Sequence, residues 1–374
     1  MRGVLRTLWG LLFVLPLIGC AWAAETQLRT VPIIGLAAVS ASSSVMGGSP
    51  TPPAEVLTNS VTAAGIAPCI RNAVVHDPST MVKCKDQYWL FYTGRGVSSR
   101  HSADLVTWTR GPSVFSSPPS WVSEAVPANR NLDYWAPDVI YLAGRYLLYY
   151  SASTFGKNVS GIGLTTSPTL DPGDPAFGWT NLGPVILSTA QDDFNAIDPS
   201  VFHDADGSLW LTFGSFWSGI RMAQLDPKTG QRLASSSTIW SLAHYDSIEA
   251  SYLYQRGSYY YLFVNWGMCC RGTSSTYRIC VGRSTKVTGP YVDKQGKDML
   301  YDGGTLFLDS TPPYIGPGHA GIIEDGGRYW LSCHYEGLMP ANGAAGQRGG
   351  SRLAVLPMRW STDNWPELDL EPAK

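Results

Sequence analysis

Five short runs of aromatic and aliphatic residues recur along the chain, and each has the length of a β-strand. The runs are residues 88–92, 146–150, 209–213, 259–263 and 329–332. Polar connectors rich in Gly, Pro, Asn and Asp lie between them, as in residues 171–175 and 226–230, and helical periodicity is almost absent. The pattern predicts an all-β protein built from repeated short strands.

A polar motif precedes each of these runs. Asp77 and Asp198 each begin Asp-Pro-Ser, Asp138 follows Ala-Pro, Glu249 lies in Ile-Glu-Ala, and His319 lies in Gly-His-Ala. The motifs recur at intervals that range from 51 residues, between Asp198 and Glu249, to 70 residues, between Glu249 and His319. Repeats of about this size that contain only short strands are typical of a β-propeller with one four-stranded blade per repeat. We therefore predict a five-bladed β-propeller.

The same five positions are candidates for a functional site. The innermost strands of a propeller run beside its central channel, so equivalent residues of different blades converge on one place. Carboxyl groups that share a cleft cannot all ionise freely, which lets one remain an acid while another is a base. We expect Asp77, Asp198 and Glu249 to act together in this way. For Asp138 we favour a structural role at the entry to its blade.

A structural interpretation exists for each acidic motif taken alone. An Asp-Pro-Ser motif is often an Asx turn that begins a strand. Glu249 is harder to explain in this way, because it lies in the strand-like apolar segment Ile-Glu-Ala-Ser-Tyr-Leu, where a Glu side chain is disfavoured. The three residues at similar repeat positions therefore favour a functional role.

The N-terminus has the features of an export signal. Arg2 and Arg6 flank the start of an apolar segment over residues 8–17, and residues 21–23, Ala-Trp-Ala, have the form of a cleavage site. We predict a signal peptide over residues 1–24 and a secreted or periplasmic protein. Residues 17–20, Leu-Ile-Gly-Cys, also resemble a lipoprotein box, in which Cys20 would carry a lipid anchor. No other run is apolar and long enough for a transmembrane helix.

Residues 25–65 are small, polar and rich in Ala, Ser and Pro. Such a segment buries too little apolar surface to fold by itself, so we expect a low-complexity linker or arm. The propeller, and with it the catalytic domain, is then expected to occupy residues 66–374.

The cysteine content agrees with export. Beyond Cys20 there are six cysteines, an even number that is typical of an oxidising compartment. We expect them to have a structural role, and their spacing does not resemble a zinc site. Adjacent Cys269 and Cys270 could form a disulfide with each other or pair elsewhere. The six are Cys69, Cys84, Cys269, Cys270, Cys280 and Cys333.

Charge and composition narrow the choice of partner. The chain has 374 residues and a formal net charge of −2, which gives no electrostatic argument for binding nucleic acid or an anionic membrane. Its 14 Trp and 19 Tyr favour a carbohydrate partner, because flat aromatic faces stack on sugar rings. Nothing indicates an oligomer, so we expect a monomer.

The ordered set of motifs resembles the endo-1,5-α-L-arabinanases of glycoside hydrolase family 43 over roughly residues 70–360. The resemblance implies an enzyme that hydrolyses internal α-1,5 linkages of arabinan, a pectin side chain, with inversion of configuration. An exo-acting α-L-arabinofuranosidase or β-xylosidase of the same fold is an alternative, as is a carbohydrate-binding propeller without activity. The segments that carry the resemblance are residues 76–79, 133–138, 195–200, 214–217, 248–250 and 316–320.

The resemblance also implies roles for particular residues. Asp77 would be the general base, Glu249 the general acid, and Asp198 the residue that raises the pKa of Glu249 and orients it. An inverting pair of carboxyl groups lies about 6.5–9.5 Å apart, which residues on different blades can satisfy. The implied substrate-binding residues are Asp77, Trp135, Gly156, Asn195, Ala196, Ile197, Asp198, Ser215, Phe216 and Trp217.

Two of these assignments leave alternatives. Trp135 and Trp217 could stack on sugar rings or could instead pack in the core. His319 matches a family histidine that helps to hold a metal, generally calcium, largely through water. Calcium itself prefers oxygen ligands, so His319 alone does not establish the metal.

Overall fold

The structure is a computed structural model that describes residues 61–338 and 350–370. The chain divides into two compact units, residues 1–53 and residues 54–374, and every described residue belongs to the second. The predicted signal peptide, the alternative lipid anchor at Cys20 and most of the predicted linker lie outside the described residues.

Five antiparallel sheets make up the described part of the chain. The first sheet contains β2 (Val82–Cys84), β3 (Gln87–Tyr92), β5 (Ser98–Ser102) and β6 (Thr109–Arg110). The second contains β7 (Asp133–Leu142), β8 (Arg145–Ala152), β9 (Ser160–Ser167) and β10 (Thr180–Ser188), with β4 (Gly94–Arg95) paired to β7. The third contains β11 (Ser200–His203), β12 (Leu209–Phe213), β13 (Ile220–Leu225) and β14 (Ile239–Ala243).

The last two sheets complete the set. The fourth contains β15 (Ile248–Arg256), β16 (Tyr259–Trp266), β17 (Arg278–Ser284) and β18 (Thr305–Leu308). The fifth contains β19 (Tyr314–Asp325), β20 (Arg328–Leu338), β21 (Arg352–Trp360), β22 (Pro366–Leu368) and the first strand of the chain, β1 (Ile70–Val74). These sheets are the blades of a five-bladed β-propeller, as predicted.

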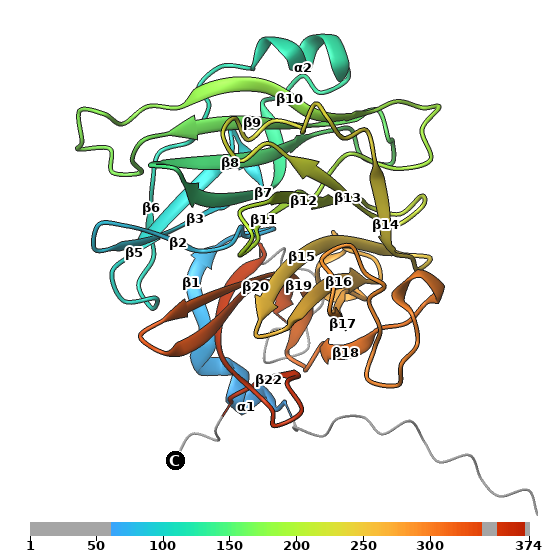
Figure 1. The fold of residues 1–374 in the computed structure, drawn as a ribbon. Helices are drawn as coiled ribbons and strands as arrows, with labels where there is room; N and C mark the ends of the chain where they lie inside the picture. The colour runs from blue at the N-terminus through green and yellow to red at the C-terminus, as the bar shows by residue number, and fades with distance from the viewer. Residues whose placement is uncertain (1–60, 339–349, 371–374) are drawn as a thin grey trace, which may run out of the picture. The chain divides into compact units, whose positions relative to one another are not determined.

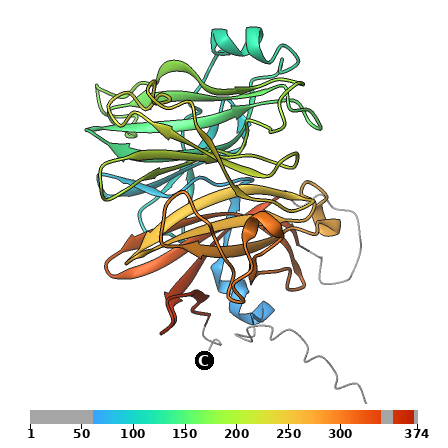
Figure 2. The same ribbon diagram turned by 45° about the vertical axis from the view of Figure 1, so that its right-hand side comes forward.

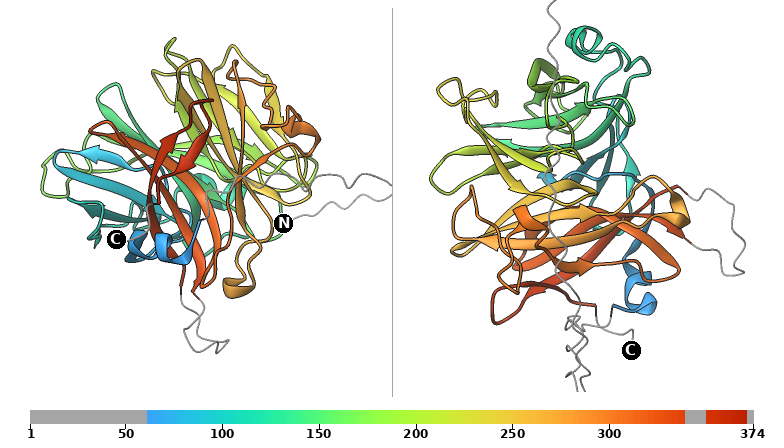
Figure 3. Two further views of the ribbon diagram at one scale, coloured as in Figure 1. Left: turned by 90° about the horizontal axis from the view of Figure 1, so that it is seen from below. Right: turned by 90° about the vertical axis from the view of Figure 1, so that its right-hand side faces the viewer.

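Each blade packs against the next through its own hydrophobic cluster. Successive residues of a strand point to opposite faces, and β8 shows the result: Leu148 and Tyr150 pack toward the first blade, whereas Leu147 and Tyr149 pack toward the third. The sheets therefore lie face to face around one centre (Figure 2, Figure 3).

Burial on both faces explains the apolar runs in the sequence. The five predicted runs correspond to β3, β8, β12, β16 and β20, which is the second strand of every blade. A strand covered on both faces has no solvent-facing positions that call for polar side chains, so it lacks the usual alternation. In β12, for example, every residue from Leu209 to Phe213 is buried.

The ring is closed by pairing between distant parts of the chain. β1 pairs antiparallel with β21, with Ile70 opposite Ala354 and Val74 opposite Arg352. Figure 1 shows β1, in blue, beside the red and orange strands of the fifth blade. The N-terminal strand therefore belongs to the blade that contains the C-terminal strands.

Helical structure in the described residues is limited to short segments of three to six residues. The helices are α1 (Ala63–Ile66), α2 (Ser120–Ala125) and the 3-10 turns η1 (Ala67–Cys69), η2 (Gly272–Ser274) and η3 (Met299–Tyr301). None of these helices is long and apolar enough to cross a membrane.

The folded region begins earlier than the sequence predicts. The linker is predicted to reach residue 65, yet α1 starts at Ala63, and the side chain of its N-cap residue Thr62 accepts a hydrogen bond from the backbone N–H of Gly65. Ile66 is fully buried in the cluster between the fourth and fifth blades. This short segment of small residues is thus ordered because a helix cap and the apolar side chains of Val61 and Ile66 attach it to the propeller.

Each innermost strand contains, or closely follows, one residue in the left-handed region. These residues are Asp77 (φ 48°), Ala136 (φ 42°), Asp198 (φ 56°), Ala250 (φ 53°) and His319 (φ 59°). In β7, β15 and β19 the residue lies at a break in strand register, as in a β-bulge. These five residues are the equivalent positions of the repeat.

This equivalence corrects the sequence alignment of the blades. The sequence places Asp138 and Glu249 at the same repeat position as Asp77, but Asp138 lies two residues after the left-handed residue of its blade, and Glu249 lies one residue before. The equivalent positions in these two blades are occupied by Ala136 and Ala250, which lie at bulges. Because alanine has no polar side chain, the sequence does not mark these positions.

Candidate active site

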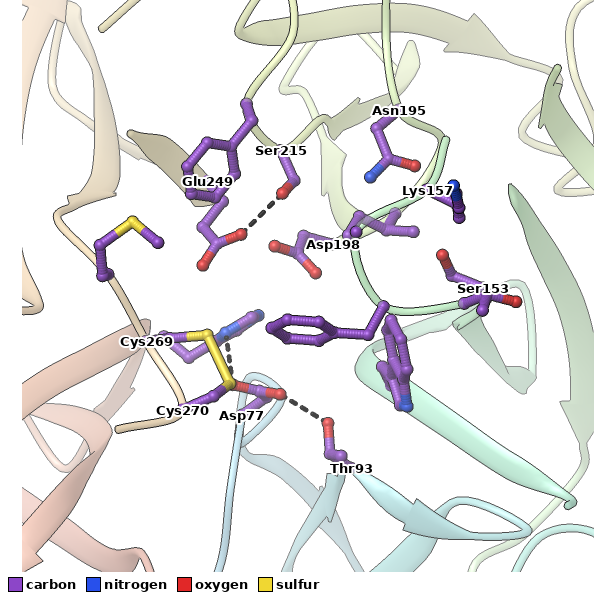
Figure 4. Close-up of a pocket in the computed structure, with 18 of the residues that line it drawn as sticks. Asp77, Thr93, Ser153, Lys157, Asn195, Asp198, Ser215, Glu249, Cys269 and Cys270 are labelled. Carbon is purple, nitrogen blue, oxygen red and sulfur yellow. Dashed lines mark hydrogen bonds and ion pairs between the residues drawn. A yellow bond between two sulfur atoms is a disulfide. The ribbon is translucent and has the colours of Figure 1, made fainter. Parts of the chain in front are cut away.

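A cavity of about 730 Å³ lies where the innermost strands begin. Figure 4 shows that Asp77, Asp198 and Glu249 all point into it from different blades. The residues that line it are His76, Asp77, Thr93, Trp135, Ser153, Thr154, Phe155, Gly156, Lys157, Asn195, Ile197, Asp198, Ser215, Phe216, Trp217, Glu249, Met268, Cys269, Cys270, Tyr277 and His319.

The cavity contains the predicted catalytic, substrate-binding and metal-site residues with one exception. Ala196, predicted to bind substrate, is fully buried in the cluster between the second and third blades. Its neighbours Asn195 and Ile197 line the cavity instead, and a tight turn centred on Ala196, in which Ile197 N donates to Asn195 O at 3.0 Å, directs the Ala196 side chain away from the cavity. Trp217 is 43% exposed and Trp135 is half-buried, so neither is a core residue.

Asp77 is surrounded by imidazoles. Its Oδ2 accepts a hydrogen bond of 2.6 Å from Thr93 Oγ1, and its Oδ1 lies 3.2 Å from His319 Nδ1, 3.6 Å from His76 Nε2 and 3.7 Å from His334 Nδ1. Burial alone would raise the pKa of Asp77, but the charges of His76 and His319 lower it well below its usual range. Asp77 is therefore an ionised carboxylate.

Glu249 has a different environment. Ser215 Oγ donates a hydrogen bond of 2.6 Å to its Oε2, and the Tyr277 hydroxyl donates to its Oε1. Burial raises the pKa of Glu249 above its usual value although both hydroxyl donors oppose the shift, and the charge of Asp77 raises it further. Glu249 and Asp77 thus have pKa values that are moved in opposite directions.

Asp198 interacts electrostatically with both Glu249 and Asp77. Burial and the neighbouring Glu249 raise the pKa of Asp198, so the two carboxyl groups disfavour each other's ionisation. The backbone N–H of Asp198 donates a hydrogen bond to Ser151 Oγ at 3.0 Å, which fixes the position of the residue. The pair Asp198 and Glu249 can hold one proton in the pH range where Asp77 is already ionised.

A repeated hydrogen bond fixes the backbone around the cavity. In four of the five left-handed residues, the backbone N–H donates a hydrogen bond to a side chain of the preceding blade. The accepting residue lies in the second strand of that blade or directly after this strand. The pairs are Asp77 with His334 Nδ1, Ala136 with Thr93 Oγ1, Asp198 with Ser151 Oγ and His319 with Asn265 Oδ1.

The fifth position departs from this pattern. Gly214 occupies the place that Thr93 has in the first blade, since Gly214 N donates to Ile197 O as Thr93 N donates to His76 O. Glycine offers no acceptor side chain, and Asp198 Oδ2 instead accepts from the N–H of Ala250 at 3.1 Å. The absent side chain is thus replaced by a carboxylate of the site itself.

Asp138 does not line the cavity. Its carboxylate accepts hydrogen bonds from Thr80 N at 3.0 Å and from Val201 N at 2.9 Å, and so it connects the first three blades. Burial raises the pKa of Asp138 although these hydrogen bonds oppose the shift. The geometry supports the structural alternative for this residue.

His319 is poorly suited to ligate calcium directly. Burial would lower the pKa of His319, but its ion pair with Asp77 raises it to about 9. A protonated imidazole has no lone pair for a metal, and calcium prefers oxygen donors. Around Asp77, the residues with ligand atoms close enough to share an ion are His76, Asp77 and His334, and this set contains a single carboxylate.

Several lining residues are not predicted by the sequence. Phe155, which is 76% exposed, and Lys157 flank the predicted Gly156, so the Ser-Thr-Phe-Gly segment is a usable signal for them. Thr93 and Tyr277 carry no such signal, because each meets its carboxylate through the folding of its own blade, 16 residues from Asp77 and 28 residues from Glu249 in the sequence.

The cysteines divide into two groups. Cys269 and Cys270, predicted to be structural, form a disulfide with each other and line the cavity. The other described cysteines, Cys69, Cys84, Cys280 and Cys333, are buried and free. The even number of cysteines therefore does not reflect a set of paired disulfides.

The class of the protein follows from comparison with known families. Residues 68–366 match the model of the glycosyl hydrolases, which makes the protein a glycosidase. The matching family is family 43, and because the match spans most of the chain, the chain belongs to it.

Similar proteins are named as arabinanases or arabinofuranosidases. An extracellular exo-α-(1→5)-L-arabinofuranosidase of Cellvibrio japonicus is 37% identical over 82% of this chain and 89% of its own. An extracellular endo-α-(1→5)-L-arabinanase of Bacillus subtilis is 39% identical over 79% of this chain and 88% of its own. The solved α-L-arabinanase of Cellvibrio cellulosa complexed with arabinohexaose is 36% identical, with a TM-score of 0.74 over 79% of this chain and 96% of that one. The protein is therefore a family 43 glycosidase of the arabinanase type.

Proposed function

We propose that the protein hydrolyses internal α-1,5 linkages of arabinan with inversion of configuration. The observation that carries the proposal is the opposite shift of two pKa values in one cavity: that of Asp77 is lowered and that of Glu249 is raised. Hydrolysis of a glycosidic bond with inversion needs one carboxylate and one carboxylic acid at the same pH.

Asp77 is the general base in this proposal. Its carboxylate stays ionised at neutral pH and takes a proton from the water that attacks the anomeric carbon. The hydroxyl of Thr93 donates to Oδ2, which orients the carboxylate. His319, paired with Oδ1, keeps the anion stable within a buried site.

Glu249 is the general acid and donates its proton to the oxygen of the departing sugar. Asp198 disfavours ionisation of Glu249 by charge repulsion and is itself held by the N–H of Ala250, the residue that follows Glu249. After bond cleavage, Glu249 is anionic and Asp77 carries the proton from water, so the pair must exchange protons with solvent before the next turnover.

The remaining lining residues bind the sugar chain. Trp217 and Trp135 offer aromatic faces on which sugar rings can stack. Asn195 and Ser215 offer hydrogen-bonding groups to the sugar hydroxyls near the carboxylates of the site. Ile197 and Phe216 add apolar contact.

Gly156 contributes through its backbone. It has a φ of 73°, and a Cβ atom added to it would meet nothing within 4 Å. Glycine is therefore favoured at this position by the left-handed conformation rather than by a lack of space, and it leaves room beside the cavity for a sugar ring.

An exo-acting arabinofuranosidase is the second candidate. It is favoured by the relative of Cellvibrio japonicus, which carries that activity in its name at 37% identity. The roles of Glu249, Asp77 and Asp198 would be the same in an exo-acting enzyme. Endo and exo action differ in whether one end of the cavity is blocked, which decides which linkage of the arabinan chain is cleaved.

Incubation with debranched linear arabinan distinguishes the two candidates. Residues 25–374 are expected to release mixed oligosaccharides early, and the Asp77→Asn variant none. Release of arabinose alone would establish the exo alternative. Proton magnetic resonance during the first turnovers is expected to detect the β-anomer, the product of inversion at an α linkage, before mutarotation.

Export and a water-mediated calcium ion complete the proposal. The two extracellular relatives support secretion, and the predicted signal peptide would direct it. Calcium is proposed to lie near His319 through water, since direct ligation by a protonated imidazole is unsuitable. The protein is proposed to act as a monomer.

A further inference from the structure

The disulfide between Cys269 and Cys270 joins neighbouring residues of the chain. A disulfide stabilises a fold mainly by closing a loop in the unfolded chain, and its effect grows with the length of that loop. This bond closes no loop beyond its own two residues. Its contribution must therefore be local, to the shape and surface of the segment that contains it.

The segment is anchored from behind by a buried carboxylate. Glu336 on β20 is 3% exposed, and its two oxygens accept hydrogen bonds from Cys270 N at 2.8 Å and Arg271 N at 3.1 Å. On the other side of the disulfide, Met268 N donates to Thr276 Oγ1 at 2.9 Å. Backbone hydrogen bonds on both sides hold the sulfur atoms in one place.

The sulfur atoms face the cavity beside the proposed base. Met268, Cys269 and Cys270 line it, and Cys270 Sγ lies 3.8 Å from His76 Nε2. Figure 4 shows the disulfide on one side of Asp198, and Ser153 and Lys157 on the other. A linear arabinan chain that crosses the carboxyl groups therefore extends toward the disulfide in one direction and toward Ser153 and Lys157 in the other.

We infer that the disulfide and Met268 form a binding surface for the arabinofuranose ring adjacent to the ring that reacts. Divalent sulfur is apolar and polarisable and suits the C–H face of a sugar, while the disulfide bond removes the thiol donors and fixes the backbone. The inference rests on the proposed function, because it assigns a substrate contact to the same cavity.

The test compares the native enzyme with the Cys269→Ala/Cys270→Ala variant on arabinohexaose labelled at its reducing end. The variant is expected to show a KM raised by about tenfold, the scale of one lost apolar contact, with kcat changed less than about twofold. The linkage that is cleaved most often should also change, because a weakened subsite alters which position of the oligosaccharide along the cavity binds best. A purely structural role would not move the position of the cut.

A phosphine reductant provides an independent measurement. Reduction of the native enzyme should raise KM in the same direction, and the double alanine variant should not respond to the reductant. Identical KM and cleavage position in native enzyme and variant would overturn the inference. A lower kcat and melting temperature with an unchanged cleavage position would also overturn it, in favour of a structural role. Failure of the native enzyme to cleave arabinohexaose would instead refute the proposed function on which the inference rests.

Discussion

Oδ2 of Asp198 accepts a hydrogen bond of 3.1 Å from the backbone N–H of Ala250. Ala250 directly follows Glu249 in β15, so this bond connects the third blade to the residue next to the proposed acid. It fixes the separation of the two carboxyl groups through the backbone. Asp198 can therefore influence both the position and the pKa of Glu249.

Asp198→Asn separates these two effects. The amide oxygen can still accept the hydrogen bond from Ala250, but the negative charge is lost, so the pKa of Glu249 should fall. Activity that requires protonated Glu249 is lost as pH rises through that pKa. The basic limb of kcat/KM is expected to move to lower pH by about one unit. An unchanged basic limb in Asp198→Asn would contradict a role in pKa control.

Variants of the acid and the base should respond differently to the leaving group. Glu249→Gln should lower the rate on arabinan by about 10²–10⁴-fold, yet retain most activity on a nitrophenyl arabinofuranoside, whose leaving group needs no proton. Asp77→Asn should lose activity on both substrates, because the attacking water still needs a base. Steady-state rates on the two substrates are the measurement. Equal losses on both for Glu249→Gln would assign the acid elsewhere.

Thr93 should be a positioning residue for the base. Its hydroxyl donates to Asp77 Oδ2 at 2.6 Å and accepts from Ala136 N at 2.8 Å. Thr93→Val keeps the shape but removes both bonds, so the pKa of Asp77 should rise and the acidic limb of kcat/KM should move to higher pH. Unfolding should also become easier by about 1–3 kcal/mol, because a backbone N–H loses its partner.

Thr93→Ser is the matched control, since it keeps the hydroxyl and removes only the methyl group. It should retain the native acidic limb. If Thr93→Ser and Thr93→Val share one pH profile, the hydroxyl does not orient Asp77.

Asp138→Asn tests the contact between blades. The carboxylate accepts from Thr80 N and Val201 N, and an amide can serve only one of these donors through its oxygen, because its NH₂ group is itself a donor. The free energy of unfolding in urea is expected to fall by about 1–3 kcal/mol. The exposed turn residue Asp86 supplies the control, and Asp86→Asn should change stability by less than about 0.5 kcal/mol. Equal stability of the two variants would exclude the proposed connection.

Removal of calcium tests the metal proposal. Exhaustive treatment with a chelator is expected to lower both melting temperature and rate on arabinan. Calcium should restore them better than magnesium, because magnesium is smaller and dehydrates reluctantly. No change in either quantity after chelation would refute a calcium site beside His319.

The blade repeat could be predicted because its main signal lies in side-chain type. Aromatic runs such as residues 146–150 have to be buried on two faces, and five of them require five packed sheets. The meeting of Asp77, Asp198 and Glu249 in one cavity could be predicted for a related reason, since Glu249 in an apolar strand is disfavoured without a function.

The sequence could not predict which residues occupy equivalent positions in the five blades. Left-handed backbone at Ala136 and Ala250 is favoured by neither residue, and it arises from the hydrogen bonds that their N–H groups make with Thr93 and Asp198. Such contacts depend on the packing of one blade on the next. Tyr277 could not be predicted for a different reason, since its hydroxyl reaches Glu249 within the fourth blade, where strand pairing brings together residues that lie 28 positions apart in the sequence.

The closure of the ring sets an order for biosynthesis. Arg71, on β1, donates a hydrogen bond to the backbone oxygen of Val355, 284 residues further along the chain. A ribosome has therefore to make almost the whole propeller before its first strand can find its partner. Until then, the apolar face of the first blade that packs on β21 lacks the partner that buries it. The propeller therefore completes its fold only near the end of synthesis.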